Sequence, residues 1–115
     1  MSKKKYFYEN VEIIKIIDVD TIDVGIDLGF DLWKNARIRF YGINAPEITG
    51  VEKPLGIIAR DFLIKLTPVN SFIKLQTLGQ DKFGRWLGII YKDDLNVNEY
   101  LVKEGHAVEY MVWLL

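Results

Sequence analysis

The chain has 115 residues and a net charge of −1, with 15 lysines and arginines against 16 aspartates and glutamates. This length favours one domain, over residues 1–115, and an apolar content of 50% argues for a packed core and against disorder. The absence of cysteine excludes a disulfide framework, a thiolate metal site and a thiol nucleophile. The near-neutral charge excludes an overall positive field, so phosphate binding would need a local cluster of basic residues.

The N-terminal region gives no indication of export. Lys3–Lys5 precede a mixed aromatic and polar segment and not an apolar one, so we expect no signal peptide and a cytoplasmic protein. No apolar run is long enough to span a membrane. We expect no membrane partner, and we expect the protein to be a monomer.

The first half of the chain predicts a β-meander of three strands. An apolar strand from Val11 to Ile17 ends at a polar turn over 18–21, and Ile22–Ile26 alternates as a second strand. A second turn is expected over 27–31. In the third strand, inward residues alternate with outward ones, namely Ala36, Ile38 and Phe40 with Arg37, Arg39 and Tyr41.

The second half predicts two helices around two further strands. Pro54 suits a first helical turn, and an apolar face recurs before Pro68 at Ala59, Phe62, Leu63 and Leu66. Strands are expected over 71–78 and 85–91. Asn96 and Glu99 resemble a capping box for a second helix that stops at Gly105. The order β-β-β-α-β-β-α matches a small β-barrel of the OB-fold type.

Three separated segments carry the polar residues that could do chemistry: Asp18-Val19-Asp20-Thr21, Arg39 to Glu47, and Asp81 to Arg85. Taken singly, they are turn residues and solvated charges. Their order and spacing together resemble the staphylococcal nuclease family, whose pattern is Asp-Gly-Asp-Thr, then Arg-x-x-Gly-Ile-Asp-x-Pro-Glu, then Asp-Lys-Tyr/Phe-Gly-Arg. The resemblance runs from about Ile13 to Trp113, without the family's third, C-terminal helix.

This resemblance implies a calcium-dependent endonuclease that hydrolyses DNA and RNA to products with 3′-phosphates. Arg39 and Arg85 would hold phosphate oxygens, and Glu47 would orient or deprotonate the attacking water. One weakly bound calcium ion would take oxygen ligands; these are Asp20, Asn44 and the carbonyl of Ala45. Substrate bases would meet a basic and aromatic rim; its members are Lys82, Phe83 and Trp113, the last of which could equally pack in the core.

Asn44 stands where the family usually has a second metal-binding aspartate. An amide oxygen can bind calcium but carries no charge, so we expect weak binding and not the loss of the site. The alternative is a nuclease-like module that binds nucleic acid or protein without catalysis. Asn44 favours that alternative, whereas Glu47 favours the enzyme, because a carboxylate beside a phosphate repels it and has no use in a binder.

Overall fold

The computed structural model describes residues 5–45 and 53–110 of the chain. Its long strands are β1 (Tyr6–Asp18), β2 (Thr21–Gly29), β3 (Leu32–Phe40), β5 (Phe72–Gln80) and β6 (Trp86–Lys92). Its helices are α1 (Lys53–Leu66) and α2 (Val97–Lys103). Three further strands have two residues each: β4 (Ile43–Asn44), β7 (Leu95–Asn96) and β8 (Val108–Glu109). The expected order of long strands and helices is confirmed.

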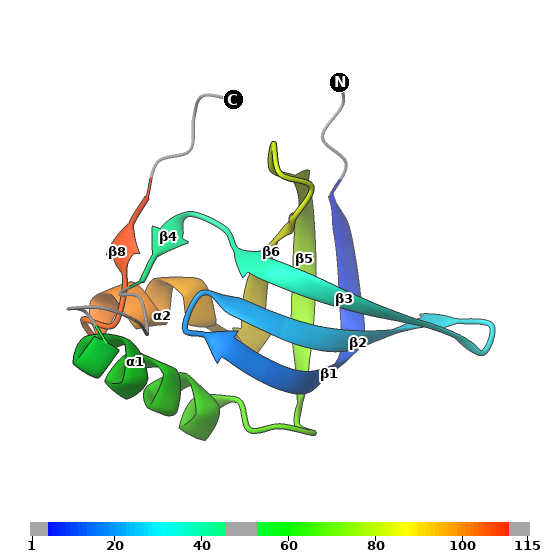
Figure 1. Cartoon of the computed structure of the whole chain (residues 1–115). Coiled ribbons are helices and arrows are strands. Elements are labelled where there is room, and N and C mark those ends of the chain that lie inside the picture. Colours follow the sequence, from blue (N-terminus) through cyan, green and yellow to red (C-terminus); the bar gives the residue numbers. More distant parts are fainter. Residues whose placement is uncertain (1–4, 46–52, 111–115) are drawn as a thin grey trace.

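The five long strands form a closed barrel. They follow the order β3-β2-β1-β5-β6 with antiparallel neighbours, and β3 also pairs with β6. This last pairing is parallel and joins Ile38 to Trp86, Arg39 to Leu87 and Phe40 to Gly88. The expected small barrel with two helices is therefore confirmed, and both helices lie at one end of it (Figure 1).

The barrel interior is filled by the inward residues of every long strand. Ile13, Val24, Leu75 and Ile90 are completely buried, and Phe40 is the largest of the fully buried side chains. Val19 is also buried although it lies in the turn between β1 and β2. The burial of these apolar side chains is the main favourable contribution to the stability of the barrel.

The hairpin between β2 and β3 is longer than the sequence indicated. The expected turn over 27–31 was too long, because β2 continues to Gly29 and β3 begins at Leu32. Phe30 and Asp31 form the turn with φ of 54° and 61°, and Asp27 accepts a hydrogen bond from the Gly29 amide. Two positive φ angles match the twist of a two-residue hairpin. The hairpin projects away from the helices (Figure 1).

The helix ends follow their sequence signals. The Asn96 side chain accepts a hydrogen bond from the Glu99 amide, as the capping box predicted. Gly105, with φ of 81°, ends α2, and the amides of Gly105 and His106 return to the carbonyls of Val102 and Leu101. Neither described helix has the length and apolar character needed to cross a bilayer.

Residues beyond α2 include a short strand that forms a separate two-stranded sheet with β4. β8 pairs with β4 through Ile43 with Glu109 and Asn44 with Val108, and the Tyr110 amide donates to the Gly42 carbonyl. No third helix occurs within residues 5–45 and 53–110. The ring of His106 packs on Phe62 at 4.3 Å between centroids, which supports a packing role for this histidine.

Candidate active site

The guanidinium of Arg39 lies between two oxygen-bearing side chains. Its Nη1 is 3.3 Å from Asp20 Oδ2, and its Nη2 donates to Asn44 Oδ1 at 2.6 Å. Nη1 also donates to the carbonyl of Phe40 at 3.1 Å. The Arg39 side chain is only 11% exposed and that of Asp20 14%. Arg39 thus faces outward, as predicted, but is shielded from solvent by its partners.

Strand pairing fixes the positions of Arg39 and Asp20. Thr21 pairs with Arg39 across β2 and β3, and the Phe40 amide donates to the Asp20 carbonyl at 2.8 Å. The Thr21 hydroxyl donates to Asp20 Oδ1 at 3.1 Å. Both carboxylate oxygens of Asp20 therefore face defined partners on rigid backbone, which is the pre-organisation that electrostatic catalysis requires.

The loop that carries Asn44 is held by two polar contacts that the sequence analysis did not foresee. One is the pairing of β4 with β8. The other is Asn98 of α2, which is buried and donates through Nδ2 to the carbonyls of Tyr41 and Gly88 while accepting from the Ile90 amide. The sequence did contain one indication of this role. Asn98 lies three positions before Leu101, so it falls on the buried face of the helix, where a polar side chain needs hydrogen-bond partners.

Arg85 directly precedes β6, the strand that pairs with β3 through Ile38 with Trp86 and Arg39 with Leu87. Its Nε donates to Asp81 Oδ2 at 2.7 Å, and the amides of Phe83 and Arg85 donate to Asp81 Oδ1 at 2.9 Å. Burial alone raises the pKa of Asp81, but the hydrogen bonds from Arg85 and Phe83 outweigh it and hold that pKa below its ordinary value. The Arg85 side chain is 48% exposed.

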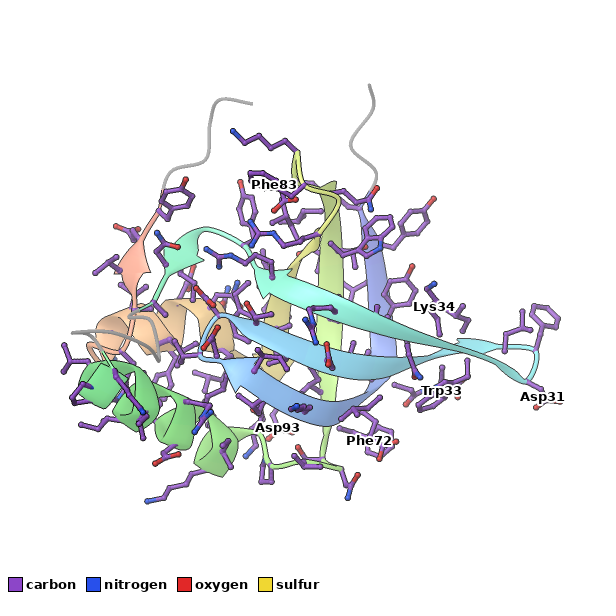
Figure 2. All side chains as sticks on the ribbon, viewed as in Figure 1. Asp31, Trp33, Lys34, Phe72, Phe83 and Asp93 are labelled. Carbon is purple, nitrogen blue, oxygen red and sulfur yellow. The ribbon has the colours of Figure 1, made fainter. Side chains whose placement is uncertain are left out.

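The same loop presents the predicted aromatic and basic contacts. Phe83 is 72% exposed, with Lys82 Nζ and Arg85 Cζ each 5.4 Å from its ring centroid. Figure 2 shows Phe83 at the outer end of this loop. Two other predicted site residues, Glu47 and Trp113, lie outside the described residues, so their positions and roles stay predictions.

The donor set suits a hard divalent cation. Asp20 offers a carboxylate and Asn44 an amide oxygen, and Arg39 brings these two groups to one place. Ala45 follows directly and can add its carbonyl oxygen, so all three donors are of the kind that calcium prefers. Within residues 5–45 and 53–110, no three His, Cys, Asp or Glu side chains gather into a cluster.

Comparison with known proteins gives a consistent picture. The family model described as staphylococcal nuclease homologue matches residues 37–114. A probable staphylococcal-like nuclease of Oryza sativa is 40% identical over 76 residues, covering 66% of this chain and 19% of the plant protein. Endonuclease YhcR of Bacillus subtilis is 32% identical, covering 92% of this chain and 9% of that protein. Micrococcal nuclease of Shigella flexneri is 32% identical, covering 86% of this chain and 57% of that protein.

Proposed function

The chain belongs to the staphylococcal nuclease family, and we propose that it is a nuclease that uses calcium to hydrolyse DNA and RNA, leaving 3′-phosphate ends. The observation that carries this proposal is the shielded guanidinium of Arg39, fixed between Asp20 and Asn44 on the outer face of β3. The chain spans only about a fifth of the plant relatives and 57% of the Shigella nuclease. Its activity is for that reason argued from its own residues.

The two arginines supply different halves of a phosphate clamp. Arg39 is held on a strand with little exposure, whereas Arg85 is tied to Asp81 through Nε alone. Within residues 5–45 and 53–110, the terminal nitrogens of Arg85 have no protein acceptor and remain available to phosphate oxygens. A planar guanidinium can bind two such oxygens at once, which lysine cannot do. Negative charge that grows on the phosphate during attack is thus met from two sides.

Glu47 is proposed to take the proton of the attacking water. It follows Asn44 and Ala45 by a few residues, so the segment that carries these oxygen donors continues directly to it. Calcium bound by Asp20, Asn44 and the Ala45 carbonyl would supply positive charge beside the phosphate. Asn44 binds Arg39 through the same oxygen that it would offer to the ion.

Digestion of single-stranded DNA and RNA with calcium, and with a chelator in its place, tests this proposal. Glu47→Gln keeps the shape and loses the base, so turnover should fall by roughly 10²- to 10⁴-fold while oligonucleotide binding is retained. Glu104→Gln, an exposed carboxylate at the end of α2, is the matched control and should cleave like the wild type. Cleavage that is equal with calcium and with chelator would contradict the metal assignment.

A binding module without catalysis is the second candidate, and Asn44 is the observation that favours it. With one carboxylate at the ion site, an inactive domain could still hold phosphate through Arg39 and Arg85. The same assay separates the two. A binder would retain oligonucleotides on the wild-type protein but release no product at any calcium concentration, and Glu47→Gln would change nothing.

A further inference from the structure

The outer face of β3 continues from Arg39 toward the tip of the projecting hairpin. Trp33, Asn35, Arg37 and Arg39 are alternate residues of β3 and so project to the same side. Alternate residues of a strand are roughly 6.6 Å apart, so this row extends for roughly 20 Å. That spacing is comparable to the distance between successive phosphates in an extended single strand. A polynucleotide lying on Arg39 could therefore follow the row.

The indole of Trp33 lies against the backbone of Gly25 on the neighbouring strand. A Cβ at position 25 would be 2.2 Å from Trp33 Cζ2, so only glycine leaves room for this ring. The indole Nε1 donates to Asn35 Oδ1 at 2.8 Å, and the residue is still 49% exposed. Trp33 and Lys34 point to opposite sides of the hairpin (Figure 2). An immobilised ring with an exposed surface is a platform on which a base can stack.

A hollow of about 310 Å³ lies over the part of β3 from Asn35 to Arg37. Its lining comes from three adjacent strands; the residues are Ile14, Asp23, Val24, Asn35, Ala36 and Arg37. The hollow is an open depression on the surface of the sheet, and its lining combines an apolar wall with an amide and a charged pair. Such a lining suits a nucleobase, which has apolar faces and polar edges.

Arg37, which lines this hollow, is oriented by an aspartate, as Arg85 is, but through two side-chain hydrogen bonds instead of one. Its Nε and Nη2 donate to the two oxygens of Asp23 at 2.8 and 3.1 Å, which leaves Nη1 directed away from that pair. Lys15 pairs with Asp23 across β1 and β2 and adds a second positive charge. At the Trp33 end the neighbours Glu12 and Asp27 are acidic. Phosphate is therefore favoured beside Arg37, and an uncharged base beside Trp33.

We propose that the row Trp33, Asn35 and Arg37 is an additional nucleotide subsite, which holds the single strand that runs on from the phosphate at Arg39. Arg37 takes the next phosphate, the hollow accepts a base, and Trp33 stacks on a base beyond it. This inference rests on the proposed nuclease function, because that function places the first phosphate at Arg39. It adds a preference for longer, single-stranded substrates, because a duplex cannot turn its bases onto the sheet.

Binding of a dinucleotide and of an octanucleotide of deoxythymidine, measured in chelator so that nothing is cleaved, tests the subsite. Wild-type protein should bind the octanucleotide more tightly, and the dinucleotide, which is too short to reach Trp33, serves as the reference. Trp33→Ala should weaken octanucleotide binding by about 5- to 150-fold, the range for a base stacked on an aromatic ring. Trp33→Tyr should restore most of this loss, since it retains a ring.

Two control variants remove equivalent groups elsewhere. Phe72→Ala deletes another exposed aromatic ring, on β5, and Lys65→Gln removes an exposed charge from α1. Both should keep the wild-type ratio of octanucleotide to dinucleotide affinity, whereas Arg37→Gln should reduce it. Melting curves identify any variant that has lost its fold. If Trp33→Ala does not fold, the affinity ratio of Trp33→Tyr is compared with that of the wild type instead.

Three outcomes are decisive. An unchanged affinity ratio in folded Trp33→Ala overturns the subsite, even where calcium-dependent cleavage is intact. A wild-type dimer that Trp33→Ala dissociates also overturns it, because the face would then bind a second copy of the chain. A length-dependent affinity that requires Trp33, in a protein that never cleaves, supports the subsite and instead refutes the proposed nuclease function.

Discussion

The two candidate phosphate-binding arginines differ in how the chain holds them. Arg39 is part of a core strand, bridges Asp20 and Asn44, and is 11% exposed, whereas Arg85 belongs to a loop, pairs with Asp81, lies over the Phe83 ring, and is 48% exposed. Each is oriented by an aspartate. Arg39 is therefore linked to the stability of the barrel, whereas Arg85 is positioned by local hydrogen bonds and can be altered without disturbing the fold.

Arg39→Ala should produce the largest effect. It removes a hydrogen-bond donor to phosphate, and it also leaves the Asp20 carboxylate without its arginine partner. Turnover should fall by about 10²- to 10³-fold, as when one positioned transition-state donor is lost. The free energy of unfolding should fall by about 2 kcal/mol, between the values for exposed and fully buried ion pairs. Single-turnover cleavage and denaturant titration measure the two losses. Arg39→Lys keeps the charge but cannot bridge both partners, so it should regain stability more than activity.

Arg85→Ala should separate activity from stability. The loss of turnover should again be about 10²- to 10³-fold. The free energy of unfolding should change by less than about 1 kcal/mol, because the pair with Asp81 is near the surface. The same two measurements apply. A stability loss as large as that of Arg39→Ala would contradict the distinction between strand-held and loop-held arginines.

Asn44→Asp should increase the affinity for calcium of the donors that lie beside Arg39. The added carboxylate would lie against Arg39, whose Nη2 now donates to the amide oxygen at 2.6 Å, so its charge is partly balanced before any ion binds. Calcium affinity should rise by roughly tenfold or more, since affinity follows the number of charged oxygens. Calorimetric titration measures this, and cleavage should gain most at low calcium. An unchanged affinity would mean that position 44 is not a ligand.

Asp81→Asn should have the smallest effect and concerns the loop-held half. It weakens the orientation of Arg85, and we expect turnover to fall by roughly fivefold, far less than when the arginine itself is removed.

Folding lowers the pKa of Asp81, so the ionised carboxylate stabilises the folded state at pH values above its unfolded pKa of 3.8. This contribution to stability is lost as the pH falls through the lower pKa of the folded state. Acid unfolding curves should show this loss in the wild type and not in Asp81→Asn.

The site could be assembled from sequence only in part. Asp20, Arg39, Asn44 and Arg85 became candidates because the order and spacing of three motifs resemble the family pattern, since each residue taken singly reads as a turn residue or a solvated charge. That Arg39 is shielded, and that it bridges Asp20 to Asn44, could not be read in this way. These contacts depend on which strands are adjacent, and local pattern does not specify the partner of a strand.

Asn98 and the C-terminal segment show the same limit. Asn98 joins α2 to two carbonyls that lie 57 and 10 residues away along the chain, and β8 pairs with a strand more than 60 positions earlier. Long-range partners of this kind are chosen by barrel closure and not by local propensity. The hairpin turn was misjudged for a different reason, because a Phe-Asp pair with positive φ is an uncommon occupant of a two-residue turn.

Periodicity and local hydrogen bonding are enough to predict the alternation that turns Arg37 and Arg39 outward, the caps of α2, the apolar face of α1 and the order of the elements. The pairing of β3 with β6, the pairing of β4 with β8, and the packing of Trp33 on Gly25 are visible only in the folded chain. The β3–β6 and β4–β8 pairings join segments that are distant in the chain, and the packing of Trp33 on Gly25 depends on the register of the β2–β3 hairpin, so none of the three follows from local pattern.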